Sequence, residues 1–292
     1  MFSLDRRSVG GAMAVGLAFA LLPLTAGAGS AQAAGPTAAG TAASRSAARL
    51  APLAQPRFAA RKVLVGKTAK GRRIVARRTG SATAPIVVLV IGQMHGSEYG
   101  GVAVTNGLAA RTDVPADVQL WTIATMNPDG YASGNRYNSR GVDLNRNFPV
   151  TWSRANRGGR RPASELETQA MMSFISALAP NGTIMFHQPW NEVLSTCDPV
   201  AAPWSFRFSD LSGVPVNRHP FCGGSVGIYT GTMGAWFRSV FPVATKKWFV
   251  TVELASGSSK KLRRVLATEQ ARSISAVITI SNDLVAGARK AG

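Results

Sequence analysis

The chain has 292 residues, 46% of them hydrophobic, and its 33 lysines and arginines outnumber its 14 aspartates and glutamates. This composition suits one sizeable globular core with a tail. The formal charge of +19 suggests an anionic neighbour, such as nucleic acid, a membrane surface or an acidic cell-wall polymer. The basic residues form only short, separate runs, RRIVARR and RGGRR, without interleaved aromatic side chains, which argues against nucleic acid.

The first 33 residues have the pattern of an export signal peptide. A basic start, MFSLDRRSVGG, is followed by a short apolar stretch, AMAVGLAFALLPL, and by small residues up to Ala33. The apolar stretch is short for a membrane span and no second one follows, so we expect no stable span after cleavage. Arg6 and Arg7 fit the twin-arginine route. These features predict an exported protein, either extracellular or associated with the cell wall.

The two cysteines of the chain, Cys197 and Cys222, are consistent with an oxidising compartment. A disulfide between them would close a loop of moderate length and stabilise the fold by about 3 kcal/mol. Two buried thiols are the alternative. The export signal favours the disulfide.

Residues 34–60 are rich in alanine with scattered glycine, proline and serine, which predicts a linker or a pro-segment. The globular catalytic domain is expected to span residues 61–292. Its first elements are a hairpin over 62–80 with turn chemistry at AKGR, a continuous apolar strand over 85–93, a helix over 100–111 and a second buried strand over 118–127.

The clearest helix is SELETQAMMSFISALAP, over residues 164–180. Ser164 is expected to cap its start, with Glu167 at the reciprocal capping position and Pro180 after its end. The remaining elements are strands over 182–188 and 247–255 and an amphipathic helix over 258–285. Buried strands that alternate with helices predict an α/β fold, a single domain with a mixed, mostly parallel central sheet flanked by helices.

Several polar residues lie at or near the ends of predicted strands, where sites form in open α/β sheets. They are His95, Asn127, His187 and Glu253. His95 and Glu98 lie three residues apart on a glycine-containing turn, and His187 ends another apolar strand. Two imidazoles and one carboxylate, with a position left for water, are the ligand set of catalytic zinc sites. We therefore predict one Zn²⁺ per chain, with a satisfied core histidine as the alternative for His187.

Glu253 lies in a strand, WFVTVELASG, that otherwise consists of apolar and threonine residues. A carboxylate there is costly unless it is paired or has a role, so Glu253 is the candidate general base and a partly buried ion pair is the alternative. The loop over 126–149 carries Arg136, Arg140 and Arg146 among asparagines and glycines. Guanidinium groups in such a loop suit the recognition of carboxylates and oxyanions.

Four segments resemble motifs of the zinc carboxypeptidases of the carboxypeptidase A type, and they occur in the family's order. They are HGSE, GVDLNRNFP, FHQP and VELASG, and the resemblance runs from about Gly66 to the end of the chain. It implies a zinc carboxypeptidase-like fold and the hydrolysis of a peptide that carries a free C-terminal carboxylate. By this resemblance His95, Glu98 and His187 match the zinc ligands.

The same resemblance implies roles for the other site residues. Glu253 matches the base that deprotonates the attacking water and later protonates the leaving amine. Arg136 matches the arginine that polarises the carbonyl and stabilises the oxyanion. Asn145 and Arg146 match the pair that binds the substrate carboxylate, and Asp143 matches the carboxylate that fixes the tautomer of the first histidine.

Within the family, NPDG, NRYNSRGVDLNRNFP and PASELET are similar to segments of the bacterial murein tripeptide amidases, which cut the γ-D-glutamyl–diaminopimelate bond. Tyr229 lies a few positions from the family's pocket tyrosine, and VGIYTGTMGAW resembles the amidases' pocket segment. Met233 and Gly234 offer no acidic group to select a basic side chain. A neutral pocket would take an apolar side chain, or a zwitterionic diaminopimelate whose distal charges are met by other groups.

The sequence thus predicts an exported zinc exopeptidase that acts on murein peptides, with a general secreted carboxypeptidase for apolar C-terminal residues as the alternative. A deacylase of small N-acyl amino acids fits less well, because the carboxylate-binding loop is long. A wall-binding module with a degenerate peptidase fold would lack a ligand or the base, yet all are present. The predicted partners are a peptide substrate and an anionic cell wall.

Overall fold

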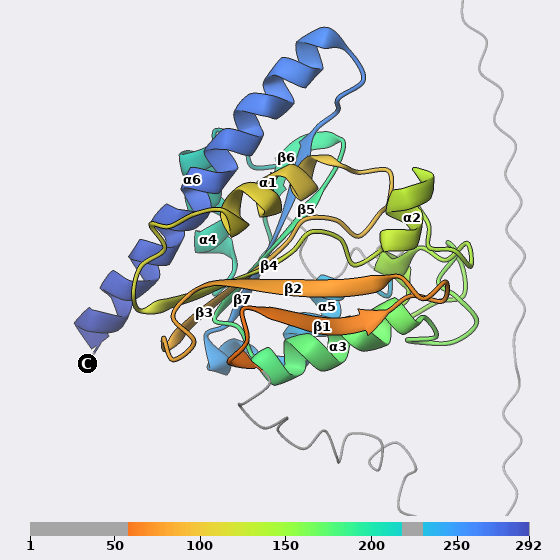
Figure 1. The fold of residues 1–292 in the computed structure, drawn as a ribbon, viewed down its shortest axis with the longest axis horizontal. Coiled ribbons are helices and arrows are strands. Elements are labelled where there is room, and N and C mark those ends of the chain that lie inside the picture. The colour runs from red at the N-terminus through yellow and green to blue at the C-terminus, as the bar shows by residue number, and fades with distance from the viewer. Residues whose placement is uncertain (1–57, 218–229, 292) are drawn as a thin grey trace, which may run out of the picture. The chain divides into compact units, whose positions relative to one another are not determined.

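Residues 58–217 and 230–291 are described by the computed structural model, and a mixed seven-stranded sheet runs through them (Figure 1). The strands are β1 (Lys62–Lys67), β2 (Arg73–Gly80), β3 (Ile86–Ile91), β4 (Val118–Ile123), β5 (Gly182–His187), β6 (Trp190–Leu194) and β7 (Trp248–Ala255). Their order in the sheet is β1-β2-β4-β3-β5-β7-β6. The central strands β4, β3, β5 and β7 are parallel to one another, whereas β1, β2 and β6 pair antiparallel at the two edges. The predicted α/β fold with a mixed sheet is confirmed.

Helices cover both faces of the sheet (Figure 1). They are α1 (Gly100–Ala109), α2 (Pro128–Ser133), α3 (Leu166–Leu178), α4 (Ala202–Ser212), α5 (Met233–Val240) and α6 (Lys260–Ala291). Helices α1, α4 and α6 lie on one face, and α3 and α5 lie on the other. The short helix α2 follows β4 at the end of the sheet where the predicted site residues lie.

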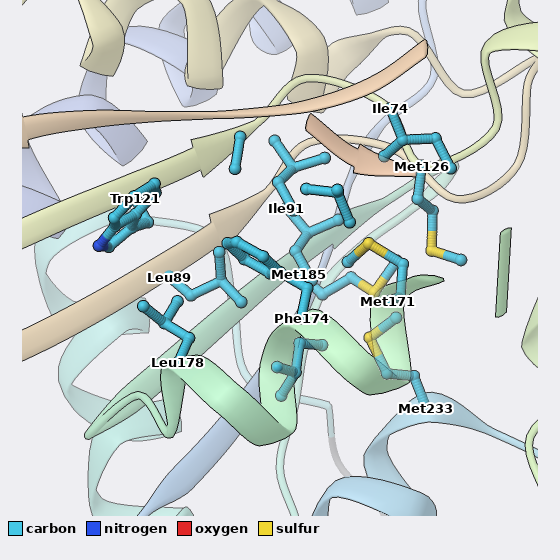
Figure 2. Packing of buried hydrophobic residues seen from close by; sticks show 14 of the residues in the cluster. Ile74, Leu89, Ile91, Trp121, Met126, Met171, Phe174, Leu178, Met185 and Met233 are labelled. Atoms are coloured by element: carbon cyan, nitrogen blue, oxygen red, sulfur yellow. The ribbon is translucent and has the colours of Figure 1, made fainter. Parts of the chain in front are cut away.

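The continuous apolar runs of the sequence are explained by this double coverage. Along β3, Leu89 and Ile91 enter the hydrophobic cluster beneath α3 and α5, while Val88 and Val90 enter the cluster beneath α1, α4 and α6. Figure 2 shows the first cluster, in which Phe174 of α3 packs near Leu89 and Met185. Because both faces are buried, every side chain of the strand is apolar.

The predicted elements agree with the structure apart from helix ends and four elements that the sequence did not indicate. The hairpin, the four buried strands, the helix after β3, the helix before β5 and the last helix are all present. Strand β6 and helices α2, α4 and α5 were not predicted. They lack a long hydrophobic period, and α5 is held by contacts with β7 and the core.

The predicted cap of α3 is wrong. The N-cap residue is Glu165, whose backbone is extended and whose side chain makes no capping hydrogen bond. The Ser164 hydroxyl instead donates to Glu165 Oε1 at 2.7 Å and accepts from Asn147. Glu167 is buried against Asn138, with Nδ2 of Asn138 3.4 Å from Oε2. Tertiary hydrogen bonds with the arginine-rich loop therefore replace the local capping pattern.

Among residues 58–217 and 230–291, no helix combines the length and the apolar character needed to cross a bilayer.

Candidate metal centre and active site

Three side chains converge at the carboxyl ends of β3 and β5. His95 Nδ1 lies 2.8 Å from Glu98 Oε1, and His187 Nδ1 lies 3.0 Å from Glu98 Oε2. The two Nδ1 atoms face each other at 3.2 Å. All three side chains are buried, and one ligand atom from each lies within 4.8 Å of the others. The sequence prediction that these residues share one place is confirmed.

The turn that carries His95 and Glu98 depends on Gly96. A Cβ atom at this position would collide with the backbone of Gly130 and Asn135. The Gly96 N–H donates to Arg136 O at 3.2 Å, and its carbonyl accepts from Gln93 Nε2 at 3.0 Å. Glycine therefore lets the turn lie against the neighbouring loop and points both ligands inward.

Asp143 binds the outer side of His95. Its Oδ1 lies 3.0 Å from His95 Nε2, so His95 Nδ1 is left to face Glu98 and His187. Burial lowers the pKa of His95, but the hydrogen bonds of Asp143 and Glu98 outweigh burial and raise it. Burial also raises the pKa of Asp143, yet the hydrogen bond and charge of His95, with Arg136 and Arg146, hold it well below its usual range. This carboxylate stays charged at neutral pH.

The charge balance also favours the ionised form of Glu98. Burial raises its pKa, but hydrogen bonds with His187 and His95 outweigh burial and bring the pKa to about 2. Arg136 donates from Nη1 to Glu98 Oε1 at 2.9 Å and from Nη2 to Asp143 Oδ2 at 3.2 Å. The predicted oxyanion-stabilising arginine thus lies directly beside the three converging side chains.

This donor set fits a zinc ion. Two imidazole Nδ1 atoms and a carboxylate point at one buried place, and Asp143 fixes the tautomer of His95 so that Nδ1 carries a lone pair. Two nitrogen ligands and one oxygen ligand form the protein part of catalytic zinc sites. The residues His95, Glu98 and His187 would hold the ion.

Glu253 lies next to this trio because β7 pairs with β5 and places Glu253 directly opposite His187. The side chain is 7% exposed, and its Oε2 atom is buried with no hydrogen-bond partner among the described residues. Burial raises its pKa, the charge of His187 opposes this, and Glu98 adds to the rise. An unpaired carboxylate oxygen beside a metal centre is placed to accept a proton.

The predicted carboxylate-binding residues lie on a short helical turn over Leu144–Arg146. Asp143 caps this turn by accepting from Asn145 N at 2.9 Å, so one side chain fixes both the turn and His95. Asn145 Oδ1 accepts from Met233 N at 3.1 Å, and Arg146 Nη1 donates to Asn145 O at 2.7 Å. The first of these bonds joins the turn to the start of α5, and the second lies within the turn.

One cavity of about 670 Å³ joins the predicted site residues. Its lining includes His95, Glu98, Arg136, Asn145, Arg146, His187, Met233 and Glu253. Tyr229, the predicted pocket tyrosine, lies outside the described residues. Cys197 also lines the cavity and is disulfide-bonded, and its predicted partner Cys222 lies outside the described residues. The candidate metal ligands, the candidate base and the candidate carboxylate-binding groups therefore border one cavity.

The family model described as "Zinc carboxypeptidase" matches residues 53–198, which is half of the chain. The chain belongs to the zinc carboxypeptidase family. This confirms the predicted family and the predicted zinc cofactor, and the matched residues include the two histidines and the glutamate described above.

Among curated proteins, the chain is 36% identical over 118 residues to murein peptide amidase A of Escherichia coli (strain K12) and 31% identical over 120 residues to that of Vibrio campbellii (strain ATCC BAA-1116). Each match covers 35% of this chain, and 48% or 47% of the relative. The chain thus spans about half the length of the curated relatives that it matches.

Solved structures share the fold at low sequence identity. The murein-tripeptide amidase of Escherichia coli O157 is 20% identical, with a TM-score of 0.55, over 75% of this chain and 94% of that chain. Carboxypeptidase A of Helicoverpa armigera is 18% identical, with a TM-score of 0.61, over 77% of this chain and 69% of that chain. The zinc carboxypeptidase-like fold is therefore confirmed.

Two residues singled out in the sequence do not reach the cavity lining. Asn127 caps α2, where its Oδ1 accepts from Gly130 N at 2.9 Å. Arg140 pairs with Glu165 at 3.8 Å on the outer side of the loop. Both are structural residues of this zinc carboxypeptidase.

Among the polar residues of the cavity lining that the sequence analysis missed, three make side-chain bonds that connect separate segments. Gln188 accepts from Gly100 N at 2.7 Å and donates to Ala255 O at 2.6 Å, which ties β5 to α1 and β7. Asp198 and Arg238 form an ion pair in the cavity wall. The sequence could have indicated Gln188, because it directly follows His187. Arg238 lies on α5 and Asp198 lies between β6 and α4, and none of these elements was predicted.

Proposed function

We propose that the protein is an exported zinc exopeptidase of murein peptides that hydrolyses the γ-D-glutamyl–diaminopimelate bond. The observation that carries the proposal is a cavity bordered by Arg146, by the histidine–glutamate trio and by Glu253, whose Oε2 has no hydrogen-bond partner among the described residues. The similarity to murein peptide amidases supports the substrate class.

Different residues of the chain have different roles in the proposed hydrolysis. Asn145 and Arg146 bind the free carboxylate of the substrate, so that the last amide bond lies beside Glu253. Glu253 accepts a proton from the attacking water and passes it to the nitrogen of the leaving amine as the carbon–nitrogen bond breaks. Arg136 stabilises the negative charge that develops on the carbonyl oxygen. Zinc, when bound, supplies a Lewis acid that polarises a carbonyl and makes water more acidic.

Export and wall association are part of the proposal. The N-terminal signal pattern and the disulfide bond of Cys197 support an oxidising destination outside the cytoplasm. The net charge of +19 suits work beside an anionic wall.

A general carboxypeptidase for apolar C-terminal residues is the second candidate. Met185, Leu194, Phe237 and Phe249 line the same cavity and offer an apolar surface to such a side chain. The charged pair formed by Asp198 and Arg238 in that wall favours the murein peptide instead.

A hydrolysis assay on the purified protein tests the proposal. L-Ala-γ-D-Glu-meso-diaminopimelate and a blocked peptide ending in an apolar residue are supplied separately, each with and without a chelator. We expect release of diaminopimelate that stops with chelator and returns with added zinc. Release of the apolar residue alone would replace the proposal by the general carboxypeptidase.

A further inference from the structure

An ion pair lies in the wall of the active-site cavity. Asp198 follows β6 and precedes α4, and Arg238 lies on α5, so two separate segments bring the charges together. The pair joins Arg238 Nε to Asp198 Oδ2, and the side chains are 25% and 14% exposed. Both residues line the cavity that also contains the three predicted zinc ligands and Glu253.

The backbone holds both charged groups in fixed positions. Asp198 Oδ1 accepts from Val200 N at 2.9 Å and from Ala201 N at 3.2 Å. Arg238 donates from Nη1 to Phe241 O at 2.7 Å and from Nη2 to Lys247 O at 3.0 Å. A charged pair that is held in place before the ligand arrives loses little entropy on binding.

The surrounding wall is apolar, so the ion pair carries a desolvation penalty that needs a reason, such as the binding of a charged ligand. Leu194, Met185, Phe237 and Phe249 line the same cavity. Taking two charges out of water carries a desolvation penalty that their attraction repays only with good geometry and additional hydrogen bonds. Hydrophobic side chains of similar volume would serve equally well if the wall only had to pack.

The ion pair has no net charge, so the ligand group that it binds best should carry one positive and one negative charge. An ammonium group near Asp198 is repelled by Arg238, and a carboxylate near Arg238 is repelled by Asp198. A group that carries an ammonium and a carboxylate on the same carbon satisfies both residues, because charge-assisted hydrogen bonds form on each side. An α-amino-acid group at the end of a side chain has this chemistry.

We propose that Asp198 and Arg238 select a substrate whose C-terminal side chain ends in a zwitterionic α-amino-acid group, with Asp198 binding the ammonium and Arg238 the carboxylate. The inference rests on the proposed function, because diaminopimelate carries such a group at its far end. It names the groups that would meet the two distal charges of diaminopimelate, which the sequence analysis left unassigned. Met233 and Gly234 are uncharged, as expected, but the charged pair comes from Asp198 and from the following turn of α5.

Four peptides test the two charges separately. Each begins with L-Ala-γ-D-Glu, and the last residue is meso-diaminopimelate, lysine, 2-aminopimelate or norleucine. Lysine lacks the distal carboxylate, 2-aminopimelate lacks the distal ammonium, and norleucine lacks both. The wild-type protein is expected to have its highest kcat/KM with the diaminopimelate peptide.

The variants Asp198→Asn and Arg238→Gln are expected to change selectivity in opposite directions. Each should lower kcat/KM for the diaminopimelate peptide about ten- to a hundredfold, the scale of one hydrogen bond to a charged group. Asp198→Asn should also raise the relative rate of the 2-aminopimelate peptide, and Arg238→Gln that of the lysine peptide, because each removes the repelling charge. A crossover of this kind does not follow from partial unfolding.

Asp283→Asn is the matched control. It removes another Arg Nε–Asp Oδ2 ion pair, formed with Arg207 at 2.8 Å, which joins α4 to α6 away from the cavity lining. Thermal unfolding and zinc content are measured for every variant. The control is expected to leave the ratios of kcat/KM among the four peptides unchanged.

The outcomes separate this inference from the proposed function. If both cavity variants lower kcat/KM equally for all four peptides, Asp198 and Arg238 only tie α5 to the segment after β6, and the inference is wrong while the proposed function stands. If the wild-type protein hydrolyses the norleucine peptide but not the diaminopimelate peptide, the proposed function and the inference both fail.

Discussion

Two buried glutamates lie at the end of β7, one on the cavity side and one on the side of α6. Glu253 is 7% exposed and Glu269 is 6% exposed, and burial raises the pKa of both carboxyl groups. Glu269 Oε2 accepts from Ala255 N at 2.8 Å, whereas Glu253 Oε2 has no hydrogen-bond partner among the described residues. Burial and a raised pKa therefore do not mark a catalytic group. What distinguishes Glu253 is a carboxylate oxygen without a partner among the described residues, beside the three candidate metal ligands.

Glu253→Gln is the change with the largest expected effect. It keeps the size of the side chain but removes the proton acceptor, so kcat/KM should fall about 10²- to 10⁴-fold. Zinc content should stay at one ion per chain, because Glu253 is not among the three converging ligand residues. Hydrolysis of the murein peptide and metal analysis on the same sample measure both quantities.

The same substitution on the α6 side provides the control. Glu269→Gln should leave kcat/KM close to the wild-type value, since Glu269 does not line the cavity. If Glu253→Gln retained activity, or if Glu269→Gln lost as much, the distinction between the two glutamates would be wrong.

Asp143→Asn is expected to have the next largest effect. An amide still has an oxygen for the Asn145 N–H, but it no longer supplies the charge that fixes the proton on His95 Nε2. Zinc affinity should fall about 10- to 100-fold, as is usual when a carboxylate behind a ligating histidine is lost. Competition with a chromogenic chelator measures it. Unchanged affinity would show that the backbone alone orients His95.

The fold could be predicted largely because its centre is buried on both faces. Strand β3 consists entirely of apolar residues and β5 has the apolar run IMF at its centre, and such patterns do not depend on distant contacts. Strand β6 is different, because Trp190 and Asn191 are exposed and its pairing with β7 is tertiary. The same holds for the cap of α3, where hydrogen bonds with Asn147 and Asn138 override the local pattern.

The candidate site divides in the same way. His95, Glu98, His187 and Glu253 stand at strand ends in short motifs, so the sequence indicated each of them. Asp198 and Arg238 carry no such motif, and only the packing of α5 against β7 and the turn before α4 brings them together. Site residues at the ends of strands could be predicted from the sequence, whereas the charged residues of the pocket wall could not.

Glu269→Gln has the smallest expected effect, a change in how stability depends on pH. In the wild-type protein the folded state holds the Glu269 proton to a higher pH than the unfolded chain, whose carboxyl group titrates near its ordinary value of 4.5. The folded state therefore binds more protons in this range, and stability falls as pH rises from about 4.5 through the raised pKa.

Glutamine has no such proton but keeps an acceptor for the Ala255 N–H. The free energy of unfolding of the variant, minus that of the wild type, should increase with rising pH, by about 1 kcal/mol or less, on the scale of one hydrogen bond. Urea unfolding of both proteins at a series of pH values measures this difference, from which the carboxyl groups they share cancel. A difference that does not depend on pH would mean that Glu269 titrates alike in the folded and unfolded chains, and the two sides of β7 would then differ in the pKa of their glutamates as well as in their hydrogen bonds.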